Sequence, residues 1–214
     1  MANKIKRKND SFIRDALILC AITVILALLL AVVYNMTKTP IDNAAEEGKK
    51  AAYQSVFSEY ENIDVKTDDN LTKAIEEYQP EDAGAKITEG VIVSDSEGNV
   101  IGRAFIAAAK GYGGDVTVSV GLDNDGVVTG IDIVSMNETA GLGANCTNEE
   151  FKAQYQGKAG EIAVTKSETP ADNEISALSG ATITSKAVTT AVNTCISFAE
   201  SAESLGDSEV TPNE

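Results

Sequence analysis

The feature that most constrains this chain is an uninterrupted apolar stretch near its N-terminus. Residues 16–34 (ALILCAITVILALLLAVVY) form a run of 19 residues without a charged side chain. At a rise of 1.5 Å per residue, a helix of this length crosses a hydrocarbon core of about 30 Å. The sequence therefore predicts one transmembrane helix over residues 16–35, so the rest of the chain folds outside the bilayer.

The charges on either side of this stretch predict its orientation. Residues 1–14 contain five basic residues and one acidic residue, whereas the remainder has 12 basic and 32 acidic residues. Because basic flanks stay on the cytoplasmic side, we expect residues 1–15 to be cytoplasmic and the chain after residue 35 to be extracytoplasmic. A cleaved signal peptide is the alternative. Its apolar region is normally only about 7–15 residues long, and no small-residue cleavage site follows Tyr34.

Composition excludes several classes of function. The 214 residues carry a formal net charge of -16, so the acidic body argues against nucleic acid as a partner. The chain has no His, which excludes imidazole general bases, His-containing triads and imidazole metal sites. Its three cysteines are too few and too scattered for a zinc site or a disulfide framework.

Residue patterns divide the remainder of the chain into three regions. Pro40 is expected to end the anchor, and residues 36–85 are predicted to form a helical stalk or linker, with an amphipathic helix over 41–60 and a short helix near 71–78. Residues 86–200 are predicted to be the folded extracytoplasmic domain. Residues 201–214 are acidic and polar, which favours a disordered tail.

Period-two alternation begins near Lys86. Apolar runs at 90–93, 100–109, 115–122 and 127–134 are separated by the turn segments 95–99 and 123–126 and by the glycine-rich residues 111–114. Such runs predict an antiparallel sheet with hairpin connections. Residues 188–199 return to helical spacing. The predicted class is therefore α+β: an antiparallel sheet with flanking helices, preceded by a single N-terminal transmembrane helix.

Two of the candidate functional segments are glycine-containing loops. Residues 110–114 (KGYGG) place Tyr112 among three glycines, which allow backbone to approach a ligand while the ring packs on it. By composition alone a bulged turn explains this loop better. Residues 138–143 (ETAGLG) combine an acid, a hydroxyl and two glycines. Each segment is a weak signal by itself.

The third segment is the hydroxyl-rich turn LSGATITS at residues 178–185. It lies where a helix is predicted to begin, with Thr184 and Ser185 as N-caps and Ser179 supporting the turn. The free N–H groups and the dipole of a helix N-terminus favour a phosphate. From these residues alone, a capping turn without a ligand is the simpler interpretation, because Ser and Thr caps are common.

Together the three segments resemble the FMN-binding domain family, which includes the RnfG component of the Rnf ion-translocating oxidoreductase and its counterpart in the sodium-pumping NADH:quinone reductase. The match covers about residues 10–200, and it is more similar to RnfG. Asn137, Ala140 and Ser176 stand where the family often has His, Pro and Asp. The resemblance implies that a flavin transferase, with FAD as donor, attaches FMN to Thr182 through a phosphoester. It implies cofactor contacts from Ser179, Gly180, Ala181, Thr184, Glu138, Thr139, Gly141, Leu142, Gly143, Tyr112 and Gly113.

The same resemblance implies a function. The chain would be a membrane-anchored subunit that relays electrons through covalent FMN between reduced ferredoxin and NAD, beside the membrane and iron–sulfur subunits of an Rnf complex. It would carry no catalytic residue of its own, because the flavin performs the redox chemistry. Two alternatives remain open at this point: a stand-alone anchored flavoprotein of extracellular electron transfer, and an anchored binding module without flavin.

Overall fold

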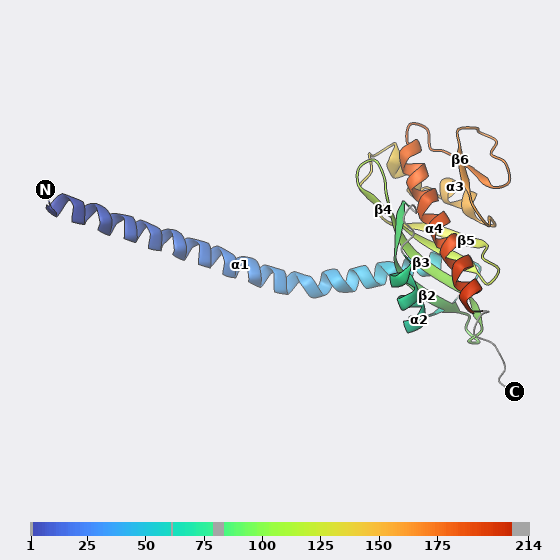
Figure 1. The fold of residues 1–214 in the computed structure, drawn as a ribbon, viewed down its shortest axis with the longest axis horizontal. Coiled ribbons are helices and arrows are strands. Elements are labelled where there is room, and N and C mark those ends of the chain that lie inside the picture. Colours follow the sequence, from blue (N-terminus) through green and yellow to red (C-terminus); the bar gives the residue numbers. More distant parts are fainter. Residues whose placement is uncertain (1, 61, 79–83, 207–214) are drawn as a thin grey trace. The chain divides into compact units, whose positions relative to one another are not determined.

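The computed structural model describes residues 2–60, 62–78 and 84–206. The chain forms two units, Met1–Glu47 and Gly48–Glu214. A long helix, α1 (Ala2–Val56), contributes to both units, and the second unit holds a five-stranded sheet with further helices (Figure 1). The predicted class is confirmed: an antiparallel sheet with flanking helices follows an apolar N-terminal helix.

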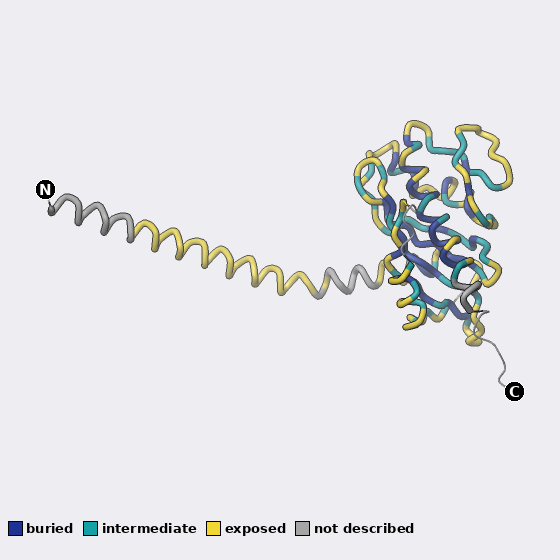
Figure 2. The backbone as a smooth tube through the Cα atoms, viewed as in Figure 1, coloured by how far each residue is buried: buried dark blue, intermediate teal, exposed yellow. Residues whose placement is uncertain are grey.

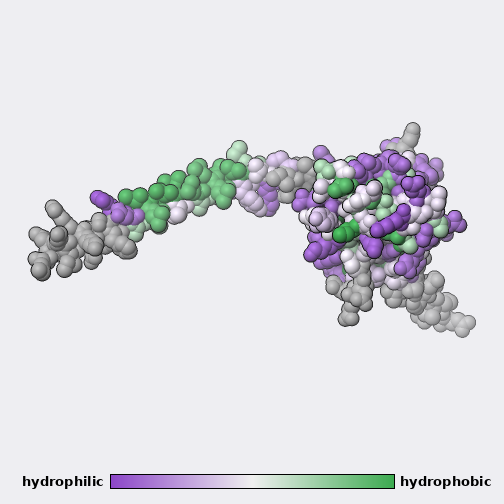
Figure 3. All heavy atoms as spheres, turned by 90° about the horizontal axis from the view of Figure 1, so that it is seen from above, coloured by the Kyte–Doolittle hydropathy of each residue, from purple (hydrophilic) through white to green (hydrophobic). Residues whose placement is uncertain are grey.

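The first unit is the exposed, apolar part of α1. The stretch Arg14–Lys38 is long and apolar enough to cross a membrane, and none of its most apolar window is buried (Figure 2). Hydrophobic side chains cover this stretch, whereas the visible face of the second unit is largely hydrophilic (Figure 3). An apolar helix with exposed side chains fits a single-pass membrane anchor.

Pro40 does not end the helix, so the predicted break at this residue is wrong. α1 continues through Pro40 as far as Val56. A proline inside a helix removes one hydrogen bond to the carbonyl four residues earlier and costs about 3 kcal/mol. Pro40 is exposed, so solvent can satisfy that carbonyl, and the helix continues on both sides.

The second unit begins at Gly48, well before the predicted domain boundary at Lys86. Two further elements lie in the segment predicted to be a stalk: the strand β1 (Asp64–Lys66) and the helix α2 (Asp69–Glu77). The short helix predicted near 71–78 is confirmed by α2. The boundary was misplaced because this polar segment contributes only a few apolar side chains, and it is their burial against the sheet that makes it part of the domain.

The sheet is an antiparallel meander in which each strand pairs with the next one along the chain. Its order is β1-β2-β3-β4-β5. The four long strands are β2 (Ala85–Ser94), β3 (Val100–Lys110), β4 (Asp115–Asp123) and β5 (Val128–Ser135). Consecutive antiparallel strands need only short turns, which agrees with the turn segments predicted between them.

The two faces of the sheet belong to two separate cores. α4 (Thr182–Gly206) lies across one face, and α2 adds Ile75 to the same core (Figure 1). The end of α1 covers the opposite face. The first core contains, among others, Phe105, Val118, Val120, Val188 and Val192. The second contains Tyr53, Val56, Phe57, Val91, Val93, Ala104 and Ile106.

A pair of glycines receives the end of α1. Gly121 of β4 and Gly130 of β5 are directly opposite each other. A Cβ at either position would lie 3.0–3.2 Å from Val56. The Thr129 hydroxyl donates a hydrogen bond of 2.6 Å to the Val56 carbonyl, which satisfies one of the free carbonyls at the helix C-terminus. The helix can approach this closely only because no side chain stands between it and the sheet.

The segment between β5 and α4 is built from short elements. They are the 3₁₀ helices η1 (Gly143–Thr147) and η2 (Ala153–Tyr155), the helix α3 (Glu149–Lys152), and the parallel pair β6 (Ala163–Thr165) and β7 (Glu174–Ser176). α4 then runs to Gly206, so the predicted disordered tail is helical at its start. Residues 207–214 of that tail lie outside the described residues.

Candidate functional site

The hydroxyl-rich turn precedes α4, which begins at Thr182. Gly180 has a φ of 72°, a left-handed conformation that favours glycine. The Ala181 N–H donates to the Leu178 carbonyl at 3.0 Å. Ser185 holds the turn from within the helix: its Oγ accepts from the Leu178 N–H at 2.9 Å and donates to the Ala181 carbonyl at 3.1 Å.

Thr184 and Ser185 are therefore not the N-caps that the sequence predicts. Both lie in the first turn of α4, and both are buried. The Ser185 hydroxyl bonds backward to the turn, and the Thr184 hydroxyl donates to Glu138 Oε2 at 3.0 Å. The helix begins earlier than predicted because these two hydroxyls find partners other than its free N–H groups.

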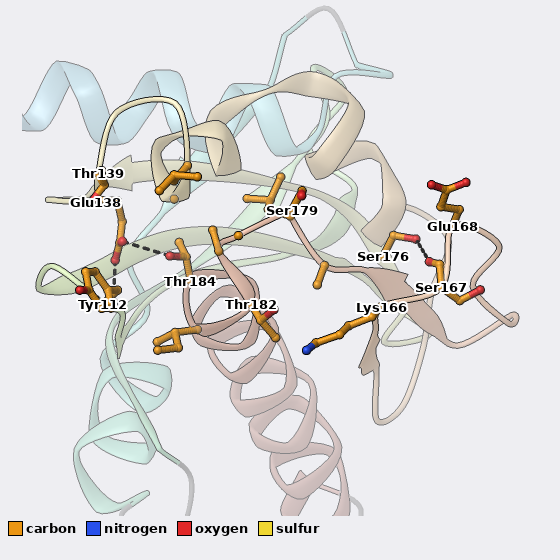
Figure 4. Close-up of a pocket in the computed structure, with 17 residues that line it drawn as sticks. Tyr112, Glu138, Thr139, Lys166, Ser167, Glu168, Ser176, Ser179, Thr182 and Thr184 are labelled. Atoms are coloured by element: carbon orange, nitrogen blue, oxygen red, sulfur yellow. Dashed lines mark hydrogen bonds between the residues drawn. The ribbon is translucent and has the colours of Figure 1, made fainter.

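A cavity of about 900 Å³ opens beside this turn and brings together segments far apart in the sequence (Figure 4). Most of the predicted site residues line it. They are Tyr112, Glu138, Thr139, Leu142, Gly143, Ser179, Gly180, Ala181, Thr182 and Thr184. The meander explains this convergence, because the loop after β3 and the loop after β5 meet at the same end of the sheet as the N-terminus of α4.

Two predicted residues do not line the cavity. A Cβ on Gly113 would overlap the Asn137 carbonyl, so Gly113 serves the close packing of two loops. Gly141 has a φ of 77° and lies in a turn in which the Leu142 N–H donates to the Thr139 carbonyl at 3.1 Å. These two glycines shape the loops.

Several lining residues were not predicted from the sequence, of which Lys166 is the most informative. Its side chain extends toward Thr182 (Figure 4). It begins a polar loop that also brings Ser167 and Glu168 to the cavity. The Ser176 hydroxyl donates to the Ser167 carbonyl at 2.5 Å, which ties this loop to β7. No sequence signal marks Lys166, because a lysine in a polar loop is normally a solvated surface residue.

The cavity has an apolar rim and a polar interior side. Tyr112, Leu142 and Ile183 are exposed by 73%, 43% and 54%, although they are large hydrophobic residues. Thr182 and Lys166 provide a hydroxyl and a cation at the N-terminus of α4. Apolar walls beside a few polar groups are typical of sites for a planar organic molecule that carries a charged end.

Neither buried thiol offers a nucleophile at neutral pH. Cys20, Cys146 and Cys195 are free in the described part of the chain. Burial raises the pKa of the Cys146 thiol to about 11, and the nearby Glu138 carboxylate adds to the increase. Burial also raises the pKa of the Cys195 thiol. Since the thiolate is the reactive form, both cysteines act as packing residues.

Comparisons with known proteins first define the class. The FMN-binding domain family matches residues 111–197, a range that includes the tyrosine loop, the 138–143 loop and the turn at Thr182. The RnfG N-terminal region family matches residues 1–56, which correspond to α1. The chain is thus an FMN-binding domain protein with the N-terminal region of RnfG.

Individual relatives then narrow the family. The G-type subunit of the Na(+)-translocating ferredoxin:NAD(+) oxidoreductase complex of Acetobacterium woodii is 35% identical over 187 residues, 84% of this chain and 87% of that protein. The proton-translocating counterpart of Clostridium ljungdahlii is 45% identical over 91 residues, 42% and 49% of the two chains. Among solved structures, Shewanella oneidensis NqrC superposes with a TM-score of 0.46 at 19% identity, over 54% of this chain and 60% of that one.

The chain belongs to the RnfG family, the G-type subunits of ion-translocating ferredoxin:NAD(+) oxidoreductase complexes. The resemblance inferred from the three loop motifs is confirmed.

Proposed function

We propose that this chain is a membrane-anchored flavoprotein subunit that relays electrons in an ion-translocating ferredoxin:NAD oxidoreductase complex through FMN bound covalently to Thr182. One observation carries the proposal: in a chain of the RnfG family, Thr182 lines a cavity at the N-terminus of a 25-residue helix. That position suits a phosphate, because the free N–H groups and the helix dipole favour negative charge.

The residues present fit FMN. At one side of the cavity, Thr182, the first turn of α4 and the Lys166 amine suit the phosphate. At its mouth the exposed side chains of Tyr112, Leu142 and Ile183 suit a flat aromatic ring. The cavity volume of about 900 Å³ is within the size range of cofactor sites. When bound, FMN supplies the capacity to accept and release electrons.

The covalent bond is a phosphoester between Thr182 Oγ1 and the FMN phosphorus. A flavin transferase forms it from FAD: the threonine oxygen bonds to phosphorus, AMP leaves, and the hydroxyl proton is released. Thr182 is half-buried, and its neighbours Ser179, Gly180 and Ile183 are exposed, so an enzyme can reach the turn. A covalent bond retains the cofactor on the extracytoplasmic side, where free flavin is scarce.

The proposed topology places α1 across the cytoplasmic membrane once, with the N-terminus inside and the FMN domain outside. The support is the exposed apolar stretch Arg14–Lys38 and the basic residues before it. The bilayer is then a direct partner of the chain.

A new surface thiol tests this topology. Ser96 lies in the exposed turn between β2 and β3, whereas Cys146 and Cys195 are fully buried and Cys20 lies in the membrane stretch. A membrane-impermeant maleimide should therefore label Ser96→Cys in intact cells, and label Asn3→Cys only after lysis. The reverse pattern would contradict the proposed orientation.

The relay role predicts partners that hold other redox cofactors, namely the membrane and iron–sulfur subunits of the complex. An open cavity mouth suits this role, because an electron can pass only when two cofactors approach closely. In the detergent-solubilised complex, the flavin of this chain should lose its oxidised absorbance after addition of NADH or reduced ferredoxin. The isolated, loaded chain should stay oxidised under the same conditions. A chain that purifies with covalent FMN but without other subunits would favour a stand-alone flavoprotein instead.

A further inference from the structure

The Glu138 carboxylate lies at the centre of the site, and protein groups occupy both of its oxygens. Oε1 accepts hydrogen bonds from the backbone N–H groups of Tyr112, at 2.8 Å, and Gly113, at 3.3 Å. Oε2 accepts from the Thr184 hydroxyl at 3.0 Å. Figure 4 shows Glu138 between the tyrosine loop and the first turn of α4, with bonds to both. Among the described residues no cation forms an ion pair with it.

Glycines surround this carboxylate. A Cβ on Gly111 would overlap Glu138 Oε1, and a Cβ on Gly143 would lie 2.6 Å from both Glu138 Oε2 and Thr184 Oγ1. Contacts below 3.0 Å are essentially never made by a real Cβ. These glycines come from the two loops whose sequences suggest the approach of a ligand. In the structure they permit the loops to approach Glu138.

The three bonds connect parts of the chain that the cofactor must touch at the same time. Tyr112 is 73% exposed, so its ring has few contacts of its own and its position depends on its backbone. Thr184 is 1% exposed and lies two residues after Thr182 in the first turn of α4. Glu138 therefore links the aromatic rim of the cavity to the helix turn that bears the attachment residue.

We infer that Glu138 is a positioning residue: it ties the tyrosine loop to the first turn of α4, and thereby sets the aromatic rim relative to Thr182 without acting as a ligand of the cofactor. The link within the protein stands on the observed hydrogen bonds. Its consequence for FMN rests on the proposed function.

Flavin-free protein tests the link separately from the cofactor. The full chain would be produced without the flavin transferase, and amide hydrogen exchange measured in detergent. In Glu138→Ala the amides of Tyr112 and Gly113 should exchange about tenfold faster or more, because a bond to a charged acceptor is lost. Glu138→Gln should restore most of the protection, since its carbonyl still accepts from both amides and its amide group can donate to Thr184. Unchanged exchange in Glu138→Ala would overturn the inference.

A second variant covers the case in which Glu138→Ala fails to fold. Thr184→Val removes one arm of the link and keeps the volume of the side chain. It should speed exchange at residues 112–113, which it does not touch, and combining it with Glu138→Gln should add less than the sum of the single effects. Strict additivity, or unchanged exchange at 112–113, would overturn the link.

The loaded protein then provides a spectroscopic signature. If Tyr112 is held against the bound flavin, native flavin fluorescence should rise at least about twofold in Glu138→Ala and stay near wild type in Glu138→Gln, because a mobile tyrosine ring quenches less. A glutamate acting as a cofactor ligand would give the opposite result: a changed flavin spectrum in Glu138→Gln, with exchange in the flavin-free protein unaltered. A chain that carries no FMN at all would defeat the proposed function and leave the exchange result intact.

Discussion

Replacing Thr182 with alanine is expected to abolish covalent FMN completely. The hydroxyl of Thr182 is the proposed phosphoester oxygen, and alanine offers no atom to replace it. The turn itself should persist, because it is held by Ser185, Leu178 and Ala181 and by the left-handed Gly180. The measurement is flavin fluorescence of the denatured protein band, with intact mass, after co-expression with the flavin transferase.

Matched variants separate the acceptor from its neighbours. Thr182→Ser keeps a hydroxyl and should keep most of the flavin, and Ser179→Ala removes an exposed hydroxyl three residues away without loss of attachment. Lys166→Glu should lower the yield of flavinylated chain by about tenfold, since it places a negative charge beside the phosphate. Fluorescence that survives Thr182→Ala would refute the assignment. A wild-type band that stays dark with the transferase present would refute covalent FMN itself.

Replacing Gly121 with valine is expected to destabilise the domain by about 3 kcal/mol, because overpacking a tight interface typically costs 1–3 kcal/mol or more. The new side chain would overlap the Thr129 hydroxyl and come within 3.0 Å of Val56, at the point where the end of α1 packs on the sheet. For a unit of this size the thermal midpoint should fall by roughly 6–12 °C. Circular dichroism of the full chain in detergent gives the midpoint.

The rest of α1 offers a control for this substitution. Gly48 is exposed on the same helix and has no neighbour within 4 Å, so Gly48→Ala should stabilise the chain by up to about 1 kcal/mol. Adding Val56→Ala to Gly121→Val should recover part of the loss, because it removes the group that clashes. An unchanged midpoint in Gly121→Val would mean that the end of α1 is not packed against these strands.

Local sequence patterns were sufficient for features that depend on a few adjacent residues. An uncharged run of 19 residues has no alternative to a helix that avoids water, and period-two alternation with turn residues produces hairpins. The four long strands, α2 and most of the cavity lining followed from such patterns. Thr182, Glu138 and Tyr112 were named as candidates from their motifs, and the structure brings all three to one cavity.

Features that depend on distant partners could not be predicted in the same way. The start of α4 was misplaced because nothing near Thr184 in the sequence shows that its hydroxyl bonds to Glu138, 46 residues earlier. β1 is too short and polar to be recognised without β2 beside it. Lys166 reaches the cavity only because Ser176 ties down the loop that carries it.

The sequence by itself determined the anchor, the antiparallel sheet and the three loops of the site, because each is encoded by composition and spacing within one segment. Only the tertiary structure decided what holds those loops together. One carboxylate, three hydrogen bonds and the glycines around it join segments that are far apart along the chain. Such contacts leave no periodic pattern, since a hydrogen bond between distant residues depends on the fold that brings them within about 3 Å.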